Sequence, residues 1–168
     1  MKTRFLTAAL LCGGALCLLA VGAQEAQAQA NGRIYLTKEK VPDDVKGAKL
    51  RKLLKKQGLS VLQKEGSADS WTANGFAKLS TRPSAKMMKL EHNEGKIQII
   101  VRKKVKRRWV QVKVGDFEYT DKARIVRFEL SLTDTHQIPT GKKHQLQLVV
   151  LNKRKKPVVL ARATFSVK

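Results

Sequence analysis

The chain has 168 residues, of which 35 are Lys or Arg and 13 are Asp or Glu, so its formal net charge is +22. Hydrophobic residues make up 42% of the chain, which excludes a disordered basic tail and is sufficient for a folded core. This length is typical of a single domain.

The first 30 residues follow the pattern of a secretory signal peptide. Lys2 and Arg4 precede an apolar run over residues 5–22, and small residues follow that run. This order predicts cleavage after Ala28 or Ala30. Glycines interrupt the apolar run, which favours a cleaved signal over a retained membrane anchor. We therefore expect an exported protein, either periplasmic or extracellular.

Cleavage would change the composition of what remains. Both cysteines, Cys12 and Cys17, lie in the expected signal peptide, so residues 31–168 contain none. Disulfides and thiolate metal sites are thereby excluded from the expected mature domain. Removing residues 1–30 leaves 33 basic and 12 acidic residues, a net charge of +21 on 138 residues. We expect one folded basic domain over residues 31–168.

The domain is expected to begin with a short strand over residues 34–36 and then one amphipathic helix. Pro42 and the two aspartates after it form a helix start signal, and the pattern over about 44–57 is helical until Gly58 ends it. Leucines share one stripe of this helix, and basic residues cover much of the rest. Such a helix can lie on an anionic membrane. Its apolar face lacks an aromatic residue, which favours docking of the leucines on a sheet.

From about residue 70 to residue 167 the apolar period becomes two, which predicts strands. Five segments place their apolar residues on one face: 96–106, 109–114, 124–132, 143–151 and 157–167. Three further segments are weaker strand candidates: 59–63, 71–79 and 87–90. Turn residues separate the segments, a pattern typical of antiparallel sheets packed on one core.

The expected fold is mainly β: an antiparallel β-sandwich, immunoglobulin-like, with one N-terminal amphipathic α-helix. An open β-barrel is the alternative. One local pattern supports the sandwich. Residues 138–146 (IPTGKKHQL) resemble the Pro-x-Gly-x-Tyr-x-Leu/Val entry to the penultimate strand of many immunoglobulin-like and fibronectin-type domains, with His144 at or near the usual tyrosine. The resemblance implies architecture and carries no function.

Cations cluster at two expected hairpin turns. Residues 102–108 carry six cations in seven positions and precede Trp109, and residues 153–156 carry four cations in a row. Basic residues at strand ends can serve solubility alone. Like charges at a turn repel one another, however, and solubility needs much less net charge. Both interpretations stay open, and the functional one is contact with an anionic polymer.

In an immunoglobulin-like arrangement these two clusters would lie at opposite ends of the domain. We predict a main polyanion-binding patch and a second one: Arg102, Lys103, Lys104, Lys106, Arg107, Arg108, Trp109, Lys142 and Lys143 in the first, and Lys153, Arg154, Lys155 and Lys156 in the second. The expected partner of an exported protein is an anionic envelope polymer or an anionic membrane surface. Nucleic acid fits less well, because base stacking needs aromatic residues and only Trp109 adjoins a cluster.

No catalytic residue, cofactor site or metal site is expected. The three histidines, His92, His136 and His144, lack HExxH spacing and are expected at the surface or at strand edges. A GxSxG motif is absent. The acidic stretch over residues 115–121 matches no EF-hand loop and is expected to pair with lysines. The first hypothesis is therefore a non-enzymatic binding module. A structural or assembly protein of the cell envelope and an unrecognised hydrolase are the alternatives.

Overall fold

The computed structural model describes residues 32–42, 44–64, 70–119 and 123–168. The expected signal peptide and its cleavage site lie outside these residues. The elements in chain order are β1 (Arg33–Thr37), α1 (Gly47–Gln57), β2 (Val61–Leu62), β3 (Ser70–Lys78), α2 (Ala85–Met88), β4 (Lys96–Val105), β5 (Arg108–Glu118), β6 (Ile125–Thr133), the 3-10 turn η1 (Asp134–His136), β7 (Lys143–Leu151) and β8 (Pro157–Val167).

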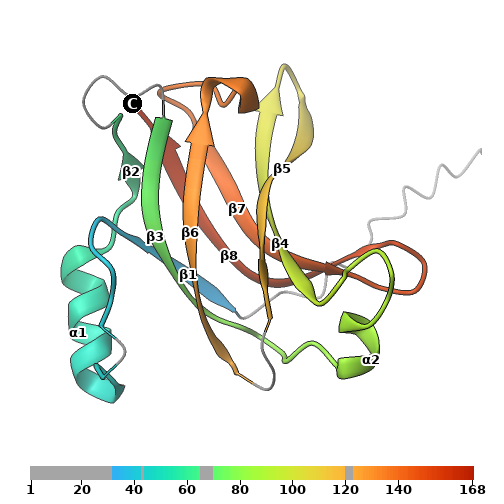
Figure 1. Cartoon of the computed structure of the whole chain (residues 1–168). Coiled ribbons are helices and arrows are strands. Elements are labelled where there is room, and N and C mark those ends of the chain that lie inside the picture. Colours follow the sequence, from blue (N-terminus) through green and yellow to red (C-terminus); the bar gives the residue numbers. More distant parts are fainter. Residues whose placement is uncertain (1–31, 43, 65–69, 120–122) are drawn as a thin grey trace, which may run out of the picture.

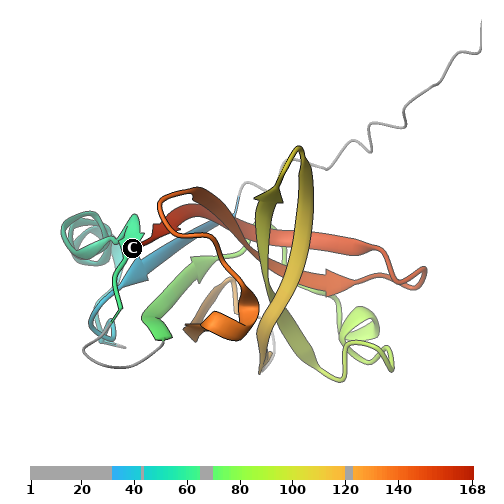
Figure 2. The ribbon, with the colours of Figure 1, turned by 90° about the horizontal axis from the view of Figure 1, so that it is seen from above.

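The described strands form one curled, open sheet (Figures 1 and 2). Their order is β5-β4-β7-β8-β1-β3-β6, and β2 pairs with β8 off this path. Neighbouring strands are antiparallel, except that β8 pairs in parallel with β1 and β2. The mainly β prediction is confirmed. Because β8 and β1 pair directly, the strands stay in one sheet, so the immunoglobulin-like sandwich is not confirmed and the curled sheet fits the open-barrel alternative.

The two edge strands of the sheet approach each other at a pair of aromatic rings. Phe117 on β5 and Phe128 on β6 stack with their ring centroids 5.5 Å apart. Gly75 on β3 lies opposite Phe128 in the β3–β6 register, and a Cβ atom at Gly75 would overlap the Phe128 ring. The absent side chain therefore leaves room for the ring that bridges the edges and helps to curl the sheet.

The concave face of the sheet holds the main core. In β6, Val126, Phe128, Leu130 and Leu132 are buried and alternate with more exposed residues. The buried residues that pack with them come mainly from strands β1, β3, β4, β7 and β8. The edge strand β5 contributes only Val114 and Phe117, which are half-buried against this core. The period of two in the sequence thus identifies the inward face of most of these strands, but Val105 and Val110, which share the pattern, are exposed.

Helix α1 packs on the convex face over β1 and β3. Leu50 and Leu54 are buried in a second cluster with Phe76, which confirms docking of the leucine stripe on the sheet. The predicted position of the helix needs correction. It begins at Gly47 rather than at about residue 44, with Lys46 at the N-cap position, and it follows β1, which contains the short strand predicted over residues 34–36. No helix in the described part of the chain is long and apolar enough to cross a bilayer.

The three weaker strand candidates have different outcomes. Segment 71–79 is confirmed as β3, and only two residues of 59–63 form a strand, β2. Segment 87–90 was wrongly expected as a strand, because it belongs to α2 and the turn that follows. The physical reason is a local cap: Ser84 Oγ accepts a hydrogen bond from the Met87 backbone N–H at 3.2 Å.

Candidate anion-binding sites

The two basic clusters lie at opposite ends of the sheet (Figure 1). We call residues 102–109 the β4–β5 tip and residues 152–156 the β7–β8 turn. In the antiparallel β4–β7 pair, Arg102 lies opposite Gln145 and Gln98 lies opposite Val149, so the end of β4 lies beside the start of β7. The structure therefore brings Lys142 and Lys143 to the same end as the β4–β5 tip.

Most cations of the β4–β5 tip lie in strands and not in the turn. Only Lys106 and Arg107 lie between β4 and β5, and Lys106 adopts a left-handed φ of 54°. Lys104 pairs with Trp109, and Val105 pairs with Arg108. Because side chains alternate along a strand, the hairpin distributes its cations over both of its faces.

Lys103 is the exception within the tip, because its side chain is buried. Only 7% of it is exposed, and its ammonium donates to the backbone carbonyls of His136 and Gln137, both at 2.9 Å. Residue Thr133 braces the same loop, since its backbone N–H donates to His136 Nδ1 at 3.0 Å. Lys103 thus ties η1 to β4, and its charge is committed to this loop instead of the exposed patch.

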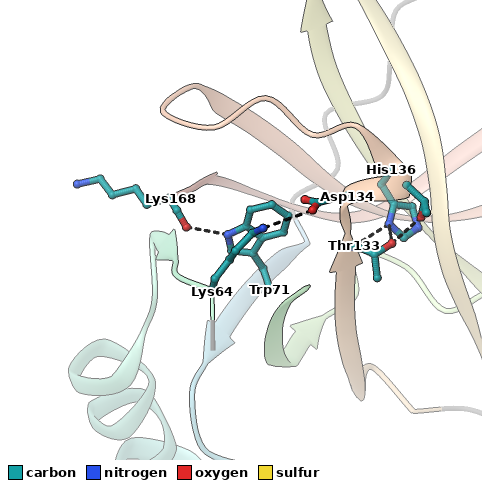
Figure 3. A network of polar contacts seen from close by, with 7 residues as sticks. Lys64, Trp71, Thr133, Asp134, His136 and Lys168 are labelled. Carbon is teal, nitrogen blue, oxygen red and sulfur yellow. Dashed lines mark hydrogen bonds and ion pairs between the residues drawn. The ribbon is translucent and has the colours of Figure 1, made fainter. Parts of the chain in front are cut away.

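A second set of contacts lies beside η1 (Figure 3). Lys64 Nζ lies 3.4 Å from the Asp134 carboxylate and 4.9 Å from the centroid of the Trp71 ring. Trp71 Nε1 donates to the backbone carbonyl of Lys168 at 2.8 Å. The Lys64–Asp134 pair is exposed, so it adds a weak link between η1 and the lysine that lies over Trp71 of β3.

Six cations at this end remain exposed: Lys104, Lys106, Arg107, Arg108, Lys142 and Lys143. None of the six forms an ion pair with another described residue. Apolar surface adjoins them, because Trp109 is 51% exposed and Val105 and Val110 are also exposed. The Arg102 guanidinium lies 5.4 Å from the Trp109 ring centroid, which is within cation–π range.

The β7–β8 turn is shaped by Asn152 and not by its cations. Asn152 Oδ1 accepts hydrogen bonds from the backbone N–H groups of Arg154 and Lys156, at 2.9 and 3.0 Å. Lys155 adopts a left-handed φ of 56°. These bonds satisfy the turn backbone, and the side chains of residues 153–156 are exposed.

Asn93 and His92 clamp this turn to the segment that contains and follows α2, and the sequence had singled out only the histidine. Asn93 is 3% exposed, and its Nδ2 donates to the carbonyls of Met87 and Leu151 at 2.8 and 2.7 Å. Its Oδ1 accepts from the Leu151 N–H at 2.9 Å. His92 Nε2–H donates to the Asn152 carbonyl at 2.9 Å. The only available signal was an Asn two positions before Gly95, which indicates a turn and says nothing of a clamp.

His144 corrects the expectation that the histidines lie at the surface, because it is 1% exposed. It faces the core because it lies opposite Phe165 on β8, with the two ring centroids 5.8 Å apart. Its Nε2–H donates to the Pro139 carbonyl at 2.7 Å. An imidazole thus bonds to upstream backbone at or near the position where the resembled pattern has tyrosine.

Acidic groups in the described residues show no metal-binding arrangement. No three or more His, Cys, Asp or Glu side chains come together there. Asp116 pairs with Lys113 at 2.6 Å and with Lys96 at 4.0 Å, which confirms the predicted pairing at this position. The hydrogen bond from Lys113 lowers the pKa of the Asp116 carboxyl, and partial desolvation opposes that shift. Asp121 lies outside the described residues.

The chain matches no family model. The search of curated proteins finds no match either.

Proposed function

We propose that this protein is an exported, non-enzymatic module that binds an anionic polymer or an anionic membrane surface through the β4–β5 tip. The observation that carries the proposal is the group of six exposed cations at this end, none of them in an ion pair with a described residue. Such a group is costly to hold together in the absence of a ligand, because like charges at close range repel. A polyanion would relieve this repulsion.

The chemistry of this end suits phosphate, sulfate or carboxylate groups. Cations that neutralise a polyanion release its condensed counterions, so affinity falls steeply with salt. On an anionic bilayer each Lys or Arg near the surface contributes about 1 kcal/mol. Trp109 adds an exposed amphipathic ring beside the charges, and such rings favour the interfacial region of a bilayer. Export, expected from residues 1–30, would expose the tip to envelope polyanions.

The test compares two variants that lose the same charge. The tip variant carries Lys104→Gln, Lys106→Gln, Arg107→Gln and Arg108→Gln. The helix control carries Lys49→Gln, Arg51→Gln, Lys52→Gln and Lys55→Gln, all exposed on α1. We expect the tip variant to elute from heparin resin at lower salt and to sediment less with phosphatidylglycerol vesicles, while the helix control stays closer to the unmodified protein. Equal losses in the two variants would show that net charge, and not the tip, drives binding.

A second candidate function is protein–protein contact in envelope assembly. Strand β5 is an edge of the sheet, and Val105 and Val110 beside that edge are exposed. An unpaired edge can accept a strand from another protein. A stable complex captured from envelope extract that survives high salt and is lost on Val110→Lys would favour this function over polyanion binding.

A further inference from the structure

A pocket of about 390 Å³ lies between α2 and the β7–β8 turn, at the end of the sheet opposite the β4–β5 tip. Figure 1 shows α2 beside this turn. The clamp described above fixes the walls relative to each other, because Asn93 bonds to both Met87 and Leu151. The clamp therefore holds α2 and the β7–β8 turn, which together line this pocket, in a fixed arrangement.

The floor and the rim of this pocket differ in chemistry. Met87 and Leu90 are half-buried and supply apolar surface. Four exposed cations line the rim: Lys86, Lys153, Arg154 and Lys156. Ser84 also lines the pocket, and its hydroxyl oxygen already accepts from the Met87 N–H, so its own hydrogen can donate to a ligand.

This combination identifies a class of ligand. A purely ionic polymer would gain nothing from an apolar floor, and no aromatic side chain lines the pocket to stack on a nucleobase. An aliphatic chain packs well against leucine and the adaptable methionine side chain, while a phosphate or carboxylate would pair with lysine and arginine. The volume lies within the range of small-molecule sites.

We propose that this pocket binds a single-chain anionic amphiphile, a molecule with one alkyl or acyl chain and a phosphate or carboxylate head group. The chain lies on Met87 and Leu90, and the head group lies among Lys86, Lys153 and Arg154. This site and its ligand class are separate from the surface binding proposed for the β4–β5 tip.

The test is calorimetric titration of the protein with dodecyl phosphate below its micelle concentration. We expect saturable binding of one molecule per chain. Lys153→Gln with Arg154→Gln, and separately Leu90→Gln, should each weaken binding at least about tenfold, or about 1.4 kcal/mol. The matched control, Lys142→Gln with Lys143→Gln, loses the same charge as the first pair at the other end and should bind within about twofold. Urea unfolding checks that each variant stays folded. If Leu90→Gln lowers the urea midpoint, the variant with Lys153→Gln and Arg154→Gln, whose changes are exposed, decides the test.

Head-group and chain probes separate the contributions. Inorganic phosphate and neutral dodecyl maltoside should each bind much more weakly than dodecyl phosphate. Any of three results would overturn the proposal. Either probe could bind as tightly as dodecyl phosphate, or the control pair could lose as much affinity as the Lys153–Arg154 pair. The protein could also bind phosphatidylglycerol vesicles without binding monomeric dodecyl phosphate. The tip variant should keep its affinity for dodecyl phosphate, so failure of the proposed function and failure of this inference give different results.

Discussion

The β4–β5 tip and the β7–β8 turn carry comparable runs of cations, but different structures lie behind them. At the tip, the cations of a two-stranded hairpin point to both of its faces, and only Lys103 is tied to a neighbouring loop. At the turn, Asn152 shapes the backbone and Asn93 clamps it to α2. A hairpin with exposed charge suits an extended anionic surface, whereas a turn braced by a helix encloses a pocket.

The largest expected effect comes from breaking the clamp. Asn93→Ala removes three hydrogen bonds and leaves two carbonyls and one N–H of Met87 and Leu151 without this partner. Unsatisfied buried groups cost about 1–3 kcal/mol each, partly recovered by water, so we expect the free energy of unfolding to fall by about 3 kcal/mol. Urea denaturation measures this, and dodecyl phosphate binding should be lost as well.

A loss below about 1 kcal/mol would mean that the clamp does not hold the two walls together, given the usual cost of such groups. Asn152→Ala is the matched control within the same end. Its bonds stay inside one exposed turn, so it should cost about 1 kcal/mol and weaken amphiphile binding less than Asn93→Ala.

The second-largest expected effect is a difference in unfolding free energy between substitutions at two neighbouring lysines of the tip, Lys103 and Lys104. Lys103→Met removes the ammonium that bonds to the carbonyls of His136 and Gln137, and we expect a loss of about 1–2 kcal/mol in unfolding free energy. Lys104→Met changes an exposed side chain and should stay within about 0.5 kcal/mol. Thermal or urea unfolding of the pair checks this, and equal stabilities would contradict a structural role for Lys103.

Trp109→Ala sharpens the choice between a bilayer and a polymer at the tip. The exposed ring can enter the interfacial region of a bilayer but contributes no charge. We expect affinity for phosphatidylglycerol vesicles to fall about fivefold, equivalent to about 1 kcal/mol, with little change in elution from heparin. A parallel loss on both ligands would place the tryptophan in polymer binding instead.

The smallest effect concerns Asp116, at the end of β5 remote from the tip. Lys113 lowers the folded-state pKa of this carboxyl, so its stabilising contribution is present above the unfolded pKa and lost as pH falls through the folded pKa. The side chain is 30% exposed, and solvent screening limits the effect to about 0.5 kcal/mol or less. Urea midpoints of the protein and of Lys113→Gln should differ at about pH 6 and converge as the pH falls through the lowered pKa of Asp116. A constant difference would contradict the pairing.

Alternating residues made the strands and their inward faces predictable, as in β6, where Val126 to Leu132 follow the expected order. The approach of the two edge strands was not predictable, because it involves the Phe128 ring, for which Gly75 leaves room although it lies 53 positions earlier in the sequence. Local periodicity also cannot distinguish one curled sheet from two stacked ones.

The candidate binding sites also have features that the sequence predicts and features that it does not. Six cations in residues 102–108 look equivalent in the sequence, yet Lys103 is buried because η1 packs over the inward face of β4. The pocket at the β7–β8 turn could not be predicted, since α2 lies more than 60 positions before it and segment 87–90 has an ambiguous period. The sequence therefore predicted where the cations cluster, but not which of them is buried or which of them line a pocket.

Salt dependence of heparin binding tests the role of the tip most directly. It compares the tip variant with a turn variant of equal charge loss that carries Lys153→Gln, Arg154→Gln, Lys155→Gln and Lys156→Gln. We expect the slope of log affinity against log salt concentration to become shallower by about 3 in the tip variant, and to change by less than about 1 in the turn variant. Equal flattening in both variants would contradict a binding site centred on the β4–β5 tip.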